Sequence, residues 1–162
     1  MRLFKHLFAP SAKRLFPGDS LKRITDAIAE SERHHSGEIC FAVEPALHPR
    51  AVLSGAQARD RAHEAFAQLR VWDTHANNAI LLYLLLADHR IEIVADRGFL
   101  GRVSDVQRRG VCQLIEERLR AGEAEAGVPA GVAALTEILV EHFPREEGVH
   151  DENELPALPY VL

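Results

Sequence analysis

The sequence has few of the residues that mark specialised chains. Only two of its 162 residues are cysteines, and neither Cys40 nor Cys112 has a second Cys or a His at metal-ligand spacing. A disulfide framework and a cysteine zinc site are therefore excluded as the basis of the fold. We expect two buried, reduced thiols, which suits a protein of the reducing cytoplasm.

Long hydrophobic runs are missing as well. The longest spans only residues 79–87, whereas a helix that crosses a bilayer needs about 20 apolar residues. The first ten residues, MRLFKHLFAP, interleave basic and apolar side chains and lack the unbroken apolar region of a secretory signal. We therefore expect no transmembrane segment and a cytoplasmic location.

An excess of positive charge is also absent. The formal net charge is -5 and the pI is about 6.0, which gives no general field for attracting nucleic acid, so we expect no nucleic-acid partner. Hydrophobic residues make up 47% and charged residues 27%, as in ordinary globular domains. We divide the chain into an N-terminal amphipathic extension (1–17), an α/β domain (18–144) and an acidic, proline-containing tail (145–162).

The basic residues concentrate at the N-terminus. Residues 1–16 carry four Lys and Arg residues and no acid, interleaved with Leu and Phe. The apolar side of this segment either docks on the domain or contacts a partner protein or a membrane surface. The sequence leaves both alternatives open.

Hydrophobic periodicity predicts a mixed α/β fold. Apolar residues recur at helical spacing after Asp19, which stands where an N-cap residue should. Runs rich in Ile, Val and Leu, bounded by turn residues, predict strands. The expected helices are 19–34, 54–70, 100–121 and 125–142, and the expected strands are 38–44, 79–87 and 90–95.

The expected strand order brings polar loops together. A tight turn at Asp88-His89 would pair Ala87 with Arg90 and place Leu81 opposite Asp96. A right-handed crossover helix would make the first two strands parallel. One end of the sheet would then gather Ser36, Glu38, Asp73, His75, Asn77, Asn78, Asp96 and Arg97.

This oxygen-rich set predicts a binding site for a hard cation. Carboxylates and amide carbonyls suit Ca²⁺ or Mg²⁺. The expected ligands are Asp73, Asn77, Asn78 and Asp96, and the expected lining residues are Ser36, Glu38, His75 and Arg97.

A structural interpretation of the same residues remains open. In it Asp73 and Asn77 cap turns, Asp96 and Arg97 form a loop ion pair, and Gly98 provides a positive φ at the strand exit. His34 and His35 would form the exposed end of a helix.

Motifs of cofactor and nucleophile chemistry are absent from the sequence. It contains no P-loop, no Gly-rich dinucleotide turn, no Cys-x5-Arg loop and no Gly-x-Ser-x-Gly. We therefore expect no nucleotide or organic cofactor, and the catalytic residues, if the chain is an enzyme, are unknown.

Several strings resemble the TPM domain family over residues 16–156. They are HSGEICFAVEPAL, ARDRAHEAFAQLRVWDTHANNAILLYLLLADHRIEIVADRGF and the closing HFP and NELP. The similarity is greatest to the soluble, standalone bacterial branch. It implies a three-layer α/β/α sandwich around a small mixed sheet, and it links the chain to relatives associated with divalent-cation binding and acid phosphatase activity. The family's Asn-Asn-Gly-Val-Leu string is matched from Asn77 to Leu81, and its acidic-Gly element by Asp96 and Gly98.

Departures from the family pattern affect the expected site. Ala79 stands where the family usually has Gly, a Trp common early in the next helix is missing, and the Asp-x-Ala-Gly string of exported relatives is absent. The resulting hypothesis is a TPM-like protein of unassigned reaction that binds a divalent cation. One alternative is a metal-assisted acid phosphatase in which Arg97 neutralises phosphate charge. The other is an interaction module without catalysis.

Overall fold

A four-stranded mixed sheet forms the centre of the molecule. The computed structural model describes residues 1–146, 153–156 and 158–162. The strand order is β3-β2-β1-β4, in which β1 pairs in parallel with β2 and with β4, while β2 and β3 are antiparallel. The strands are β1 Glu38–Glu44, β2 Ala79–Leu85, β3 Arg90–Ala95 and β4 Tyr160–Val161.

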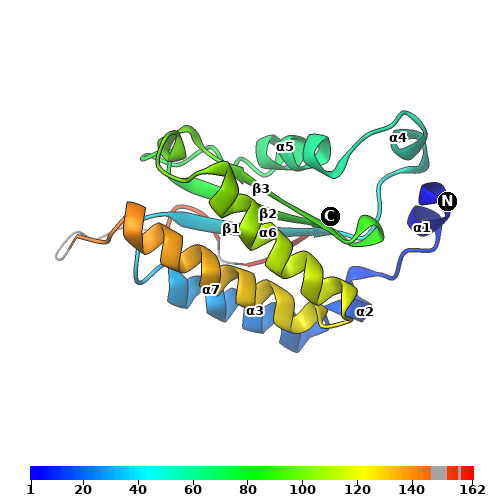
Figure 1. The fold of residues 1–162 in the computed structure, drawn as a ribbon, viewed down its shortest axis with the longest axis horizontal. Coiled ribbons are helices and arrows are strands. Elements are labelled where there is room, and N and C mark those ends of the chain that lie inside the picture. The colour runs from blue at the N-terminus through cyan, green and yellow to red at the C-terminus, as the bar shows by residue number, and fades with distance from the viewer. Residues whose placement is uncertain (147–152, 157) are drawn as a thin grey trace.

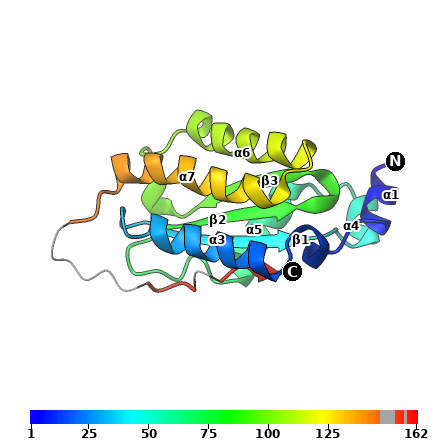
Figure 2. The ribbon, with the colours of Figure 1, turned by 90° about the horizontal axis from the view of Figure 1, so that it is seen from below.

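Helices cover both faces of this sheet. Figures 1 and 2 show α5 on one face and α3, α6 and α7 on the other, so the three-layer α/β/α sandwich is confirmed. The short helices α1 and α4 lie side by side at one end of the molecule. The helices are α1 Arg2–Leu7, α2 Ala12–Leu15, α3 Gly18–Ser31, α4 Pro49–Leu53, α5 Ala58–Gln68, α6 Asp105–Arg120 and α7 Ala124–His142, with 3₁₀ turns η1 Leu86–Asp88 and η2 Arg97–Phe99.

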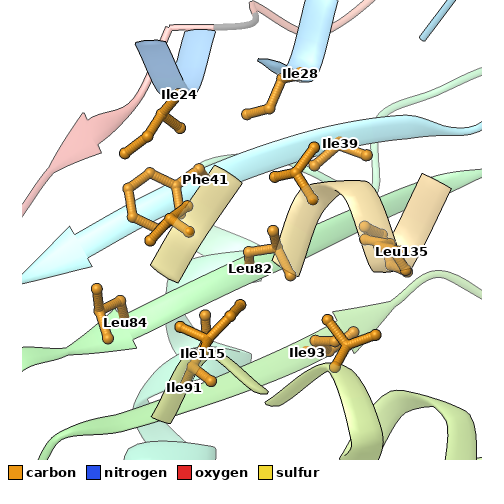
Figure 3. Packing of buried hydrophobic residues seen from close by; sticks show 14 of the residues in the cluster. Ile24, Ile28, Ile39, Phe41, Leu82, Leu84, Ile91, Ile93, Ile115 and Leu135 are labelled. Atoms are coloured by element: carbon orange, nitrogen blue, oxygen red, sulfur yellow. The ribbon is translucent and has the colours of Figure 1, made fainter. Parts of the chain in front are cut away.

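The central strands feed two separate hydrophobic cores. Side chains alternate across a strand, so Ile39 and Phe41 of β1 enter the core under α3, α6 and α7, while Cys40 and Ala42 enter the core under α5. Figure 3 shows the larger core, where Ile24 of α3 lies near the β1 side chains. Each aliphatic side chain fully buried there contributes about 1.5–3 kcal/mol, which explains why β1 and β2 tolerate almost no polar residues.

Capping explains where two helices begin. The hydroxyl of Ser104 accepts the backbone N–H of Gln107 at 3.2 Å, and the Gln107 side chain accepts the N–H of Ser104 at 2.9 Å. This capping box starts α6 at Asp105, five residues after the predicted start. Pro17 precedes the first residue of α3 and leaves Asp19 in the first turn, where it complements the helix dipole instead of acting as the N-cap.

The hairpin register differs from the predicted one by two residues. Leu85 pairs with Arg90, and Leu81 pairs with Val94 rather than lying opposite Asp96. The reason is that the chain turns through η1 and then through His89, whose φ is 49°. A shift of two residues keeps every side chain on its predicted face, so the polar loops still meet at one end of the sheet.

Both ends of the chain contact the domain. The side chain of Phe16 is completely buried in the larger core, and Leu3 packs against the smaller one. At the other end, β4 extends the sheet and Leu162 donates its N–H to Val43 at 2.9 Å. The predicted tail also includes residues 147–152 and 157, which lie outside the described residues.

Close packing of α6 against α7 depends on Gly131. A Cβ at this position would collide with the side chain of Ile115, whereas a Cβ at Gly110 of α6 would meet nothing. We expect Gly131→Ala to lower the free energy of unfolding by about 1–3 kcal/mol through overpacking. Gly110→Ala, the matched control, should raise it by about 1 kcal/mol through helix propensity. Urea denaturation measures both, and equal stabilities of the two variants would contradict this packing.

Candidate functional site

Two loops meet at the sheet end formed by the starts of β1 and β2 and the end of β3. Gly98 donates its N–H to the carbonyl of Asn77 at 2.9 Å, and Asp96 donates its N–H to Ala79 at 2.9 Å. The expectation of a positive φ at Gly98 is wrong. Glycine is required there because a Cβ would collide with the Asn77 carbonyl oxygen.

Asp96 caps the 3₁₀ turn that follows β3. Its Oδ1 accepts the backbone N–H of Arg97 at 2.7 Å, so a backbone cap takes the place of the expected ion pair between these side chains. Its Oδ2 is buried and has no hydrogen-bond partner among the described residues. Because Ala95 packs on the larger core and Val94 on the smaller one, the strand alternation places Asp96 on the α5 face.

Asn78 lies on the opposite face of the sheet. Its Nδ2 donates to the backbone carbonyl of Ser36, which fixes the orientation of the amide, and its buried Oδ1 has no donor within the described part of the chain. Asn78 and Ser36 line a cavity of about 350 Å³ beside Phe143 and Arg102. Asn78 and Asp96 thus lie at the same end of the sheet, but their side chains are on opposite faces of it.

The C-terminal segment is hydrogen-bonded to Glu38. The two carboxylate oxygens of Glu38 accept the backbone N–H groups of Glu154 and Leu155 at 2.9 and 2.8 Å. The Glu154 carboxylate in turn accepts the N–H of His75 at 3.0 Å. Glu38 and His75 therefore hold the tail on the sheet end, a role that the sequence did not indicate.

The remaining predicted site residues are the ligands Asp73 and Asn77 and the lining residue Arg97, which are exposed or support the loop. Asp73 is half exposed and pairs with Arg70 at 2.6 Å. Asn77 has a φ of 50° and helps the loop turn toward Gly98, and Arg97 is exposed. Among the residues that the structure describes, no group of three or more His, Cys, Asp and Glu side chains is placed to hold a metal ion. The four-ligand set stays a prediction, and the structure brings only the Asn77 loop and Asp96 together.

His35, next to this site, is buried rather than exposed as the sequence suggested. Thr136 donates its hydroxyl to Val132 at 2.7 Å, so Ser31 must donate to Thr136 and accept from His35 Nε2 at 2.8 Å. This chain of hydrogen bonds fixes the neutral tautomer with the proton on Nε2. Burial lowers the pKa of His35 to about 4.

Two polar clusters at the other end of the sheet were not predicted. Arg2 donates twice to Asp88, at 3.2 and 2.8 Å, and His6 Nε2 lies 3.1 Å from the same carboxylate. Burial acts against ionisation of this carboxyl, but Arg2 and His6 hold its pKa below the usual value. The partners are more than 80 residues apart in the chain, so no local pattern could reveal them.

The second cluster joins α5 to the central strands. Tyr83 donates its hydroxyl to Glu44 at 2.5 Å, and Arg61 donates to the same carboxylate oxygen at 2.9 Å. Burial and the neighbouring carboxylate raise the pKa of Tyr83. Among the described residues, no buried side-chain N or O atom of this cluster lacks a hydrogen-bond partner, which favours a structural role over a catalytic one.

The cysteines fit the predicted structural role in part. Cys40 is buried and Cys112 is partly buried, and neither forms a disulfide. Burial raises the pKa of both thiols to about 12. Neither is therefore activated as a nucleophile.

The fold is a three-layer α/β/α domain with a mixed sheet, and loops form the candidate site at one end of that sheet. The chain belongs to the TPM domain family, whose sequence model matches residues 12–138. No curated protein matches the sequence. Within the described residues, no helix combines the length and the apolar character needed to cross a bilayer.

Three solved structures share this fold. The NMR structure of BA42 protein from the psychrophilic bacterium Bizionia argentinensis is 26% identical, with a TM-score of 0.78, and the match covers 90% of this chain and 94% of that one. The N-terminal domain of a P. gingivalis protein is 19% identical, with a TM-score of 0.59 and coverage of 82% and 83%. The N-terminal domain of a Corynebacterium glutamicum protein is 10% identical, with a TM-score of 0.57 and coverage of 83% of each chain.

The buried His35 predicts a specific pH dependence of stability. Its pKa is about 4 in the folded chain against an ordinary value of 6.5, so the unfolded state binds more protons between these pH values. The free energy of unfolding should therefore fall as the pH drops from 6.5 to about 4, by about 3 kcal/mol from this group. Urea denaturation across this range measures the slope.

The matched variants for this prediction are His35→Gln and His34→Gln. Glutamine at position 35 can still donate to Ser31 but does not titrate, so the slope should flatten. His34 is exposed, and its charge lowers the His35 pKa less than burial does, so its replacement should change the slope much less. An undiminished slope in His35→Gln would assign the acid sensitivity to other groups.

Proposed function

We propose that this chain binds a divalent cation on the α5 face of the sheet end, with Asp96 as the central ligand. The observation that carries the proposal is the Asp96 Oδ2, a buried carboxylate oxygen with no hydrogen-bond partner among the described residues. Burying such an oxygen without a partner is costly, and a hard cation would offset that cost. The buried Thr74 hydroxyl in the facing loop also has no partner in the described part of the chain.

The neighbouring backbone adds neutral oxygen donors. The carbonyls of Ala76 and Asn77 approach Gly98 closely, and the Asn77 side chain is partly exposed on the same loop. A site with one carboxylate and neutral oxygens binds weakly, because the affinity for Ca²⁺ rises with the number of charged ligands. We therefore expect a dissociation constant of about 10⁻⁴ to 10⁻³ M.

Titration of the chain with Ca²⁺ and Mg²⁺, followed by amide NMR, tests this proposal. We expect saturable shifts in residues 73–78 and 96–99 that disappear in Asp96→Asn. Asp73→Asn is the matched control, because Asp73 is paired with Arg70 on the surface and should bind the cation as the natural chain does. Loss of the shifts in the Asp73 variant but not in the Asp96 variant would refute the assignment.

The metal-assisted phosphatase alternative depends on the same cation. A bound cation would polarise a phosphoryl oxygen and acidify a bound water, and the exposed Arg97 beside Asp96 would neutralise phosphate charge. Hydrolysis of a phosphomonoester that requires the cation and is lost in Asp96→Asn would favour this alternative. Cation binding without any hydrolysis would contradict the phosphatase alternative and support cation binding without catalysis.

A second candidate function is interaction through the N-terminal segment. The side chains of Phe4 and Phe8 are 66% and 79% exposed, and adjacent exposed apolar residues mark surfaces that contact a protein or a membrane. The two free thiols favour a cytoplasmic location, where the segment would have access to partner proteins and to a membrane surface. A chain without residues 1–10 retains Ala12 and Phe16, which pack in the core of the full chain. If its thermal midpoint shows that it is folded, any binding lost in it belongs to this segment.

A further inference from the structure

Helix α1 turns two polar side chains inward and two large apolar side chains outward, while Leu3 packs against the smaller core. Arg2 and His6 point inward to Asp88, and His6 is only 5% exposed. Phe4 and Leu7, on the other side of the helix, are 66% and 53% exposed. A helix that only covered the domain would turn its apolar side inward.

Hydrogen bonds hold α1 in this orientation. A helix of six residues is not stable by itself. Asp88 binds two of the polar residues of α1, Arg2 and His6, and the backbone N–H of Leu47 donates to His6 Nδ1 at 3.0 Å. The chain therefore fixes the helix with its apolar side toward solvent.

Exposed apolar side chains are also present next to α1. Helix α4 packs beside α1, as Figures 1 and 2 show, and its Leu53 is 73% exposed. Met1 and Phe8, at the two ends of α1, are 100% and 79% exposed. We name this surface the α1/α4 patch; it consists of Met1, Phe4, Leu7, Phe8 and Leu53.

Positive charge accompanies the patch. Lys5 of α1, Lys13 and Arg14 of α2 and Arg50 of α4 are exposed. None of these four side chains forms an ion pair with any residue that the structure describes. Residues 1–16 carry four Lys and Arg residues and no acid, whereas the whole chain has a net charge of -5.

We propose that the α1/α4 patch docks the protein on an anionic lipid surface. Exposed Phe and Leu side chains on one side of a helix with Lys and Arg beside them are typical of segments that lie in the plane of a membrane interface. Anionic headgroups attract the cations, while the apolar side chains enter the boundary with the acyl chains. The inference rests on the interaction function proposed above and names its partner.

Vesicle co-sedimentation of the full chain tests the docking. We expect binding to vesicles of phosphatidylcholine mixed with phosphatidylglycerol, much weaker binding to phosphatidylcholine alone, and a loss of binding as salt is raised. Phe4→Ser/Phe8→Ser and, separately, Lys13→Glu/Arg14→Glu should each lower the affinity at least about tenfold. The control is Leu100→Ser/Val106→Ser, two side chains that are 80% and 81% exposed near the start of α6.

The outcomes separate this inference from the interaction function. No binding to anionic vesicles, or unchanged binding in Phe4→Ser/Phe8→Ser, would overturn the lipid assignment. Sedimentation velocity then shows whether the patch mediates self-association that the same variant abolishes, in which case the interaction function stands with a second copy as the partner. If neither assay responds to the variant, both proposals fail. An unchanged thermal midpoint shows that the variants are folded.

Discussion

The parallel pairing of β1 with β2, buried on both faces, is the constraint on which the rest of the structure depends. Because consecutive side chains of β1 enter different cores, each face of the sheet needs its own layer of helices. Parallel strands also need a crossover, which α4 and α5 provide. The same pairing places Glu38 beside Ala79, and so brings the loops before β1 and β2 to one end of the sheet.

Much of this arrangement could be predicted because the signals are local. The buried strands, the crossover helix and the two long C-terminal helices all have clear periodicity, and the sheet end where polar loops meet follows from their order. The misjudged details depend on contacts that are distant in sequence or on backbone conformation. The buried His35 is linked to Thr136 of α7 through the Ser31 hydroxyl, a contact between distant parts of the chain, and the hairpin register depends on how the backbone turns at η1.

The pleat of the sheet separates the side chains of two of the predicted ligands. Sequence proximity and strand order bring Asn78 and Asp96 to the same end, but their positions in the alternation place their side chains on opposite faces. Glu38 is on the α5 face but accepts two N–H groups from the tail. Asp96 retains a buried oxygen without a partner among the described residues, and for this reason the proposed cation site centres on it rather than on Asp73.

The two ends of the sheet show how differently this fold uses buried carboxylates. Asp88 is surrounded by donors from α1, so its charge serves to hold a segment whose other side faces solvent. Asp96 receives one backbone donor and retains an oxygen without a partner among the described residues. A carboxylate with all its donors stabilises structure, whereas one with an unsatisfied oxygen costs free energy until a ligand supplies the missing contact. On this physical ground we place the proposed cation site at the Asp96 end and the proposed interaction surface at the Asp88 end.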